Sequence, residues 1–171
     1  MCPDTAQSRS NVGDDPGACH DHVACLSQTL QRARAAFEAH GLRLTDLRLR
    51  VFTQIAASHH AVGAYDIIDK LGQQGTRLAP VSVYRAIEAL IAAGVVHRLE
   101  SANAYFACHA AHASERQHVI LSCSTCGTIS EVDAVPVFAA IESLARTHQF
   151  APLSRIVEIA GRCGPCTRKA A

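Results

Sequence analysis

Two Cys-x-x-Cys pairs in the second half of the chain constrain its fold more than any other feature. They are Cys123 with Cys126 and Cys163 with Cys166. Each pair places two thiolates at the apex of a turn, and two such pairs complete the tetrahedral ligand shell that Zn²⁺ prefers. The alternative is a redox dithiol, but a thioredoxin-type pair normally occurs alone at the start of a helix. We therefore predict that the four cysteines bind one structural zinc ion.

The composition favours a metal-binding protein over an exported, disulfide-rich one. The 171 residues include eight cysteines, but the sequence begins without the basic and apolar regions of an export signal. No apolar run approaches the ~18 residues that a membrane span requires. We therefore expect a cytoplasmic protein with no membrane contact. The 16 Lys and Arg residues nearly balance the 15 Asp and Glu residues, so any contact with DNA must be local.

The first half of the chain has the pattern of a winged helix-turn-helix domain. Residues 1–26 lack sustained periodicity and are acidic, so we expect a mobile tail there. Apolar side chains then recur at helical spacing in four segments. These lie at 26–41, 45–55, 64–71 and 80–94, and two short strands follow at 95–100 and 104–108. Helices followed by a β-hairpin predict a DNA-binding domain over 27–108, whose last helix enters the major groove.

The fourth predicted helix carries the residues best suited to read DNA. Arg85 points away from the buried position of Val83, and Tyr84 lies at the edge of the apolar stripe. An outward guanidinium can bind guanine O6 and N7, while the tyrosine can contact a thymine methyl group or a phosphate. Arg43 and Arg48, at the start of the second helix, are suited to phosphate contacts. A solvated surface arginine is the alternative for Arg85, and the predicted fold around it favours the DNA contact.

The second half of the chain predicts a small zinc-stabilised domain over 118–166. A hinge at 109–117 precedes it and a short tail at 167–171 follows it. Strand-like runs occur at 118–122, 128–132 and 155–160, and a helix is expected at 135–148. A domain of roughly 50 residues is barely stable alone, so we expect both a metal ion and a partner chain to support it. The predicted fold class is α+β, an N-terminal winged helix-turn-helix with a small C-terminal α/β dimerisation domain.

Several runs of the sequence together resemble the ferric uptake regulator family. They cover about residues 28–166 and read GLRLTDLRLRVFTQI, AYDIIDKL, VSVYRAIEALIAAGVVHRLES, YFACH, CSTCGTISEV and GRCGPC. RAIEALIAAGVVHRLES with YFACH most resembles the zinc uptake regulator branch. The resemblance implies a repressor of zinc-uptake genes that binds palindromic double-stranded DNA as a metal-bound homodimer.

The resemblance also implies which residues face DNA, namely Tyr65 and Arg85. We add Ser82 to this set, although the family commonly has threonine there. Asp46 stands where the family usually has proline, and an acidic residue still suits the first turn of a helix. We therefore expect DNA binding to be retained despite both departures.

A second metal site near the hinge, which senses the metal, is a further implication of the resemblance. His97, Cys108 and Glu131 match its ligands directly, whereas its remaining histidine aligns near Arg116, which cannot bind zinc. We favour His118, two residues along the same strand face. The alternates are His112 and His109. Two nitrogens, one sulfur and one oxygen suit tetrahedral Zn²⁺ better than Fe²⁺. We therefore expect two zinc ions per chain, the second fixing the angle between the domains.

Other functions remain open at this stage. An iron- or peroxide-responsive regulator of the same family is the first alternative, and a zinc-containing thiol redox protein is the second. For single histidines a surface role competes with metal binding, and for Cys108 a small core position does. The segment CHDHVAC, with Cys19, His20, His22 and Cys25, could bind another ion or reflect incidental composition. No phosphate loop, hydrolytic triad or paired-carboxylate motif is present, so we expect neither an enzyme nor a small-molecule ligand other than metal.

Overall fold

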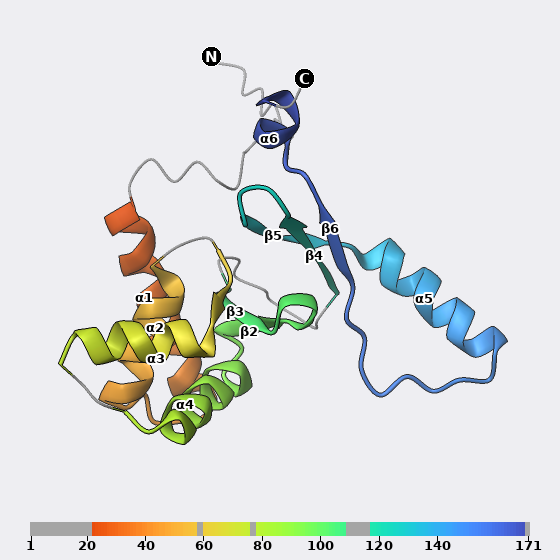
Figure 1. The fold of residues 1–171 in the computed structure, drawn as a ribbon. Coiled ribbons are helices and arrows are strands. Elements are labelled where there is room, and N and C mark those ends of the chain that lie inside the picture. Colours follow the sequence, from red (N-terminus) through yellow and green to blue (C-terminus); the bar gives the residue numbers. More distant parts are fainter. Residues whose placement is uncertain (1–21, 58–59, 76–77, 109–116, 170–171) are drawn as a thin grey trace, which may run out of the picture.

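Helices build the N-terminal half of the protein, which is described from a computed structural model covering residues 22–57, 60–75, 78–108 and 117–169. The helices are α1 His22–Ala39, α2 Asp46–Ala56, α3 Ala64–Gln73 and α4 Pro80–Ala92 (Figure 1). Thr45 caps α2 as predicted, because its hydroxyl accepts a hydrogen bond from the backbone N–H of Arg48 at 3.4 Å. The start of α1 differs from expectation, since its first residues lie inside the predicted tail.

The apolar faces of these helices meet in one core. Its largest fully buried side chains include Phe37 from α1, Phe52 from α2, Ile67 from α3 and Leu90 from α4. Each helix therefore contributes at least one side chain that is removed from water, and burial of this kind supplies most of the stability of short helices. The helical spacing of apolar residues in the sequence predicted these buried faces.

A β-hairpin, the wing, follows α4. Its strands are β2 Val96–Leu99 and β3 Ala104–Ala107, and a 3₁₀ turn, η1 Glu100–Ala102, joins them at the tip. The chain leaves α4 through Gly94, whose φ of +70° is accessible to glycine at little cost. The short strand β1, Val62–Gly63, pairs with β3 on the other side and was not predicted. The order β1-β3-β2 with the four helices confirms the winged helix-turn-helix.

The C-terminal half forms a second three-stranded sheet with two helices. Its elements are β4 His118–Cys123, β5 Ile129–Asp133, α5 Val135–Thr147, β6 Glu158–Gly161 and α6 Gly164–Lys169. The central strand β4 pairs with β5 in antiparallel and with β6 in parallel fashion. The strand β6 begins three residues later than predicted, and α6 occupies residues expected to form a knuckle and a tail. The α+β fold class is confirmed.

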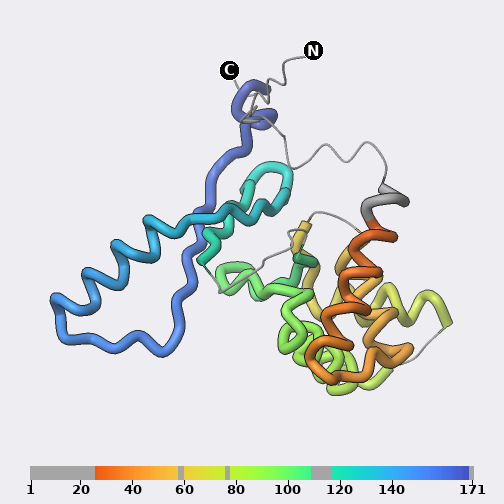
Figure 2. Tube along the Cα trace, turned by 180° about the vertical axis from the view of Figure 1, so that it is seen from behind, coloured from red at the N-terminus to blue at the C-terminus, as the bar shows by residue number. Residues whose placement is uncertain are grey.

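The wing lies between the helices of the N-terminal half and the C-terminal sheet in both views of the molecule (Figures 1 and 2). Helix α5 and the segment that returns from it to β6 extend away from the rest of the chain as an arm. This arm exposes several large apolar side chains, among them Leu144, Phe150, Leu153 and Ile156. Among the described residues, no helix combines the length and the apolar character that crossing a bilayer demands.

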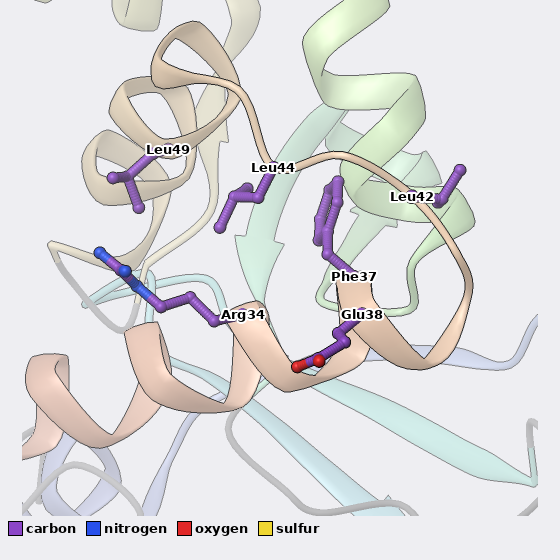
Figure 3. A pocket seen from close by; sticks show the side chains of 6 residues that line it. All are labelled: Arg34, Phe37, Glu38, Leu42, Leu44 and Leu49. Atoms are coloured by element: carbon purple, nitrogen blue, oxygen red, sulfur yellow. The ribbon is translucent and has the colours of Figure 1, made fainter.

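A groove of about 320 Å³ lies between α1 and the start of α2 (Figure 3). Four apolar side chains, Phe37, Leu42, Leu44 and Leu49, form most of its wall, and Arg34 and Glu38 of α1 also line it. The groove contains no cysteine or histidine. The groups of clustered metal-ligand side chains among the described residues lie elsewhere.

Candidate metal centres and DNA-binding surface

Strand pairing brings the four cysteines of the two Cys-x-x-Cys pairs together. Cys123 ends β4, and its partner across the parallel pairing with β6 is Gly161, two residues before Cys163. The thiols of Cys123, Cys126, Cys163 and Cys166 all lie within 4.8 Å of one another. Cys126 Sγ is 3.6 Å from Cys163 Sγ. Four thiols at this separation match the donor set and the spacing of a closed tetrahedral zinc shell.

The turn between Cys123 and Cys126 has the backbone that such a site needs. Gly127 has a φ of +74°, and its N–H donates to the carbonyl of Cys123 at 2.8 Å. The backbone N–H of Cys163 donates to Cys123 Sγ at 3.3 Å. Amide donors aimed at sulfur stabilise the thiolate, which is the form that binds a metal ion.

The electrostatics of the four thiols also favour a bound cation. Hydrogen bonds from backbone groups, first of all that of Cys163, lower the pKa of the Cys123 thiol to about 5. The neighbouring sulfurs, led by Cys163 and Cys126, raise the pKa of Cys166 to about 12. The four groups therefore cannot all ionise unaided, because each thiolate disfavours the next. A divalent cation among them would relieve this repulsion.

A second group of ligand-type side chains joins the wing to the C-terminal sheet. It contains His97 from β2, Cys108 just after β3, and Glu131 from β5, with ligand atoms within 4.8 Å of one another. His97 Nε2 lies 3.2 Å from Glu131 Oε1, and the Glu131 side chain is only 7% exposed. Three of the four residues predicted for the regulatory site are thus brought together from both halves of the chain. We call this set the hinge group.

His118, the favoured fourth ligand, is not part of the hinge group. It begins β4 opposite Asp133 of β5, and its Nδ1 is 2.7 Å from Asp133 Oδ1. The alternates His112 and His109, and also Arg116, lie outside the described residues. The same is true of Cys19 and His20, whereas His22 and Cys25 belong to the start of α1. The identity of the fourth ligand therefore remains a prediction.

Apolar side chains beside the hinge group also connect the two halves. Leu99 and Phe106 of the wing form a buried cluster with Ile129 of β5, and the half-buried Ala61 and Ile120 pack against it. We call this set the interdomain cluster. The sequence did not reveal this cluster, because the strands that supply Leu99, Phe106 and Ile129 carry no regular alternation of apolar and polar residues. His60 adds a backbone bridge to Thr128, beside the first cysteine pair.

The residues predicted to contact DNA differ in how accessible they are. Arg85 on α4 and Arg43 before α2 are exposed, and Tyr65 on α3 is 71% exposed. Tyr84 packs partly against the core, and Ser82 is half-buried.

Arg48 is engaged within the protein. Its guanidinium donates to the carbonyl of Arg43 and lies 5.9 Å from the ring centroid of Phe37. The first contact joins α2 to the segment that precedes it, and the second joins α2 to α1. Arg85 and Tyr65 are therefore better placed than Arg48 to contact DNA.

Comparison with known proteins identifies relatives over most of the chain. The model of the ferric uptake regulator family matches residues 39–160. The zinc uptake regulation protein of Escherichia coli (strain K12) is 31% identical over 139 residues, which are 81% of each protein. A structure of a zinc uptake regulator complexed with zinc and DNA is 30% identical, with a TM-score of 0.78, and covers 85% of this chain and 97% of that one.

Two crystal structures of one further relative, XcZur, show its holo and apo forms. The holo structure is 34% identical with a TM-score of 0.74, and the apo structure is 32% identical with a TM-score of 0.50. Each covers 84% of this chain and 99% of its own. With more than half of its length matched by the family model, the chain belongs to the ferric uptake regulator family.

Proposed function

We propose that this protein is a zinc-responsive transcriptional repressor that binds DNA as a homodimer and controls genes for zinc uptake. The observation that carries the proposal is the hinge group, in which His97 and Cys108 of the winged helix meet Glu131 of the C-terminal sheet. Ligands from two domains bind one ion only when the domains adopt the matching angle. Metal binding therefore selects an arrangement of the DNA-binding domain. The protein would act through binding and not through catalysis.

The donor set of the hinge group fits zinc. One imidazole nitrogen, one thiolate and one carboxylate oxygen are ligands that tetrahedral Zn²⁺ accepts, with His118 or His112 as the proposed fourth. Bound zinc would supply a divalent charge that holds these donors together. The four cysteines would bind a second ion that stabilises the small C-terminal domain, so that each chain takes up two. The E. coli relative and the zinc- and DNA-bound structure support the choice of zinc.

The arrangement of the domains supports the same mechanism. At nearly equal identity, the chain superposes better on holo XcZur than on apo XcZur, with TM-scores of 0.74 and 0.50. The described conformation therefore resembles the holo form of this relative. A coupling of about 1–3 kcal/mol between zinc and DNA would change DNA affinity about 5- to 150-fold.

Recognition of DNA would centre on α4. Arg85 is exposed on this helix, and Tyr65 is exposed on α3. A bidentate arginine–guanine contact specifies a base, whereas tyrosine, Arg43 and Ser82 are suited to backbone or methyl contacts. Two such helices related by a two-fold axis would read a palindromic operator in double-stranded DNA.

The exposed arm is the proposed dimer contact. Only Phe138 of α5 is buried within the chain, while Leu144 on the same helix is 62% exposed. Phe150 and Ile156 on the returning segment line a groove of about 420 Å³ together with this helix. An apolar surface of this kind is rare on monomers and marks a contact with another protein chain. A second copy of the chain would cover it.

The test is a DNA-binding titration of the wild-type protein in buffers of defined free zinc. The DNA duplex would first be selected from a randomised library with zinc-loaded protein, because the protein structure does not define the operator sequence. We expect two zinc ions per chain by metal analysis and DNA binding that rises as the hinge group fills. Selection of no duplex, or binding that is independent of zinc, would contradict the proposal.

An iron- or peroxide-responsive regulator is the second candidate. The sensing site of such a regulator would use histidine and carboxylate ligands. Metals that prefer soft thiolate ligands bind less well to these donors. The thiol of Cys108 within the hinge group favours zinc. The same titration with Fe²⁺ distinguishes the two candidates, since an iron sensor would respond to Fe²⁺ at concentrations where zinc has no effect.

A further inference from the structure

One face of the C-terminal sheet presents a row of three residues across its strands. Ile120 on the central strand β4 pairs with Glu131 on β5 and with Glu158 on β6. Directly paired residues of neighbouring strands point to the same side of a sheet. The row therefore runs from one carboxylate through an apolar side chain to a second carboxylate.

Each residue of this row meets a different part of the wing. Glu131 lies beside His97 near the base of the hairpin, and Ile120 packs against the interdomain cluster. Glu158 reaches the tip, where its Oε1 accepts a hydrogen bond from the N–H of Glu100 at 2.7 Å. Its Oε2 accepts a second hydrogen bond from the N–H of Ser101 at 3.0 Å. We call these two hydrogen bonds the wing-tip contact.

The wing-tip contact has the features of a strong interaction. Both carboxylate oxygens are used, and hydrogen bonds to an ionised group are roughly twice as strong as neutral ones. Burial of Glu158 acts to raise its pKa, but hydrogen bonds from Ser101 and from the amide of Glu100 outweigh it, so the pKa is lowered. The carboxylate is therefore ionised near neutral pH, as the contact requires.

The turn at the tip of the wing, which Glu158 contacts, is also stabilised by contacts within the wing. Arg98 Nη2 donates to Asn103 Oδ1 at 2.8 Å, and Arg98 Nε lies 3.3 Å from Glu100 Oε2. These contacts close the turn across the end of β2 and the start of β3. Because the turn is held in one shape, a force on its amides moves the whole hairpin and not the tip alone.

We propose that Glu158 is a positioning residue that holds the wing at its tip while the hinge group holds it near its base. This inference rests on the proposed function. A rigid hairpin attached at one end pivots about that end, whereas attachment at both ends fixes its direction. The wing-tip contact needs no metal ion, so it would keep His97 and Cys108 near Glu131 before zinc binds. Zinc would then pay less of the ordering cost, so it would bind at a lower free concentration.

The experiment compares full-length E158A and E158Q with the full-length wild type. Amide hydrogen exchange at Glu100 and Ser101 reports the wing-tip contact without DNA. Binding to a duplex selected by the wild type, measured in buffers of defined free zinc, reports how much zinc each protein needs to bind DNA. We expect faster exchange at the two amides in both variants, and a rise of about tenfold in the free zinc that gives half-maximal DNA binding by E158A. E158Q keeps one carbonyl acceptor and should show a smaller rise.

The control is E38A, which removes an exposed carboxylate of α1 that belongs neither to the wing, nor to the groups of metal-ligand side chains, nor to the arm. It should leave both the wing-tip exchange and the zinc midpoint at wild-type values. Unchanged exchange and an unchanged midpoint in E158A would overturn the inference, as would an equal shift in E38A. If E158A does not fold, E158Q decides in its place. If even the wild type shows no zinc-dependent DNA binding, the proposed function fails, and faster wing-tip exchange in the variants still supports the contact itself.

Discussion

Replacement of Leu99 by alanine would remove a buried side chain from the interdomain cluster without touching a metal ligand. Leu99 is 4% exposed and packs with Phe106 and Ile129, which are 3% and 7% exposed. Loss of a buried leucine side chain typically costs about 2–5 kcal/mol, depending on how far the site can collapse. Only three residues of this cluster are buried, so its neighbours can relax, and we expect about 2 kcal/mol, the low end of that range.

This loss of free energy would weaken the docking of the wing against the C-terminal sheet. Since about 1.4 kcal/mol corresponds to a factor of ten, the ratio of docked to undocked wing should fall about 30-fold. We therefore expect L99A to need up to about 30-fold more free zinc for half-maximal DNA binding. The assay is fluorescence anisotropy of a selected duplex in zinc buffers, with chemical unfolding of each variant alongside.

The matched control is L71A, which removes an equally buried leucine from the core of the winged helix. It should lower the free energy of unfolding of that domain by a similar or larger amount. The fraction of L71A that remains folded should reach half-maximal DNA binding at the same free zinc concentration as the wild type. A loss of stability in L99A with an unchanged zinc midpoint would refute the role of the interdomain cluster in coupling.

Three further predictions test separate parts of the account. R85A should lose about 1–3 kcal/mol of specific DNA binding with no change in zinc content; footprinting at wild-type affinity would exclude α4 as the reading helix. C163S should lose one zinc ion per chain by metal analysis, and its C-terminal domain should lose secondary structure in circular dichroism, because metal binding there replaces part of a core. L144E places a charge on the exposed face of α5 and should shift the sedimentation mass from dimer to monomer, whereas an unchanged mass would place the dimer contact elsewhere.

The sequence predicted the elements whose physical cause is local. Helical spacing located α2, α3 and α4, and the hydroxyl of Thr45 and the φ of Gly94 explain why their ends could be placed. The start of α1 was predicted too late because the acidic composition of the first residues was given more weight than Val23, which continues the spacing of Leu26 and Leu30. Composition is a weaker guide than periodicity at the edge of a helix.

The features that escaped prediction depend on contacts between distant segments. The strand β1 has two residues, too few to show any periodicity, and it forms because β3 offers a free edge. The sequence predicted a knuckle and a short tail where helix α6 lies, yet Thr167 donates from both its N–H and its hydroxyl to the carbonyl of Cys163. Both elements are fixed by neighbours that the local sequence does not reveal.

The candidate sites divide in the same way. Cysteine spacing indicated a four-thiol group, and family motifs indicated His97, Cys108 and Glu131; the structure places each set within ligand distance. Glu158 could not have been found from the sequence, because it binds backbone amides 57 and 58 residues away, and any residue supplies an amide. A contact with main-chain groups leaves no pattern of side chains to recognise.

C108S is the most direct test of whether the hinge group makes DNA binding depend on zinc. Serine keeps the size of the side chain but offers zinc a poor ligand in place of a thiolate. We predict that C108S folds, dimerises and retains the zinc ion of the four cysteines, so that metal analysis falls from two ions per chain to one. Its binding to the selected duplex should remain weak at free zinc concentrations that saturate the wild type. Wild-type zinc-dependent binding by C108S would contradict the account and leave a DNA-binding protein whose zinc is structural alone.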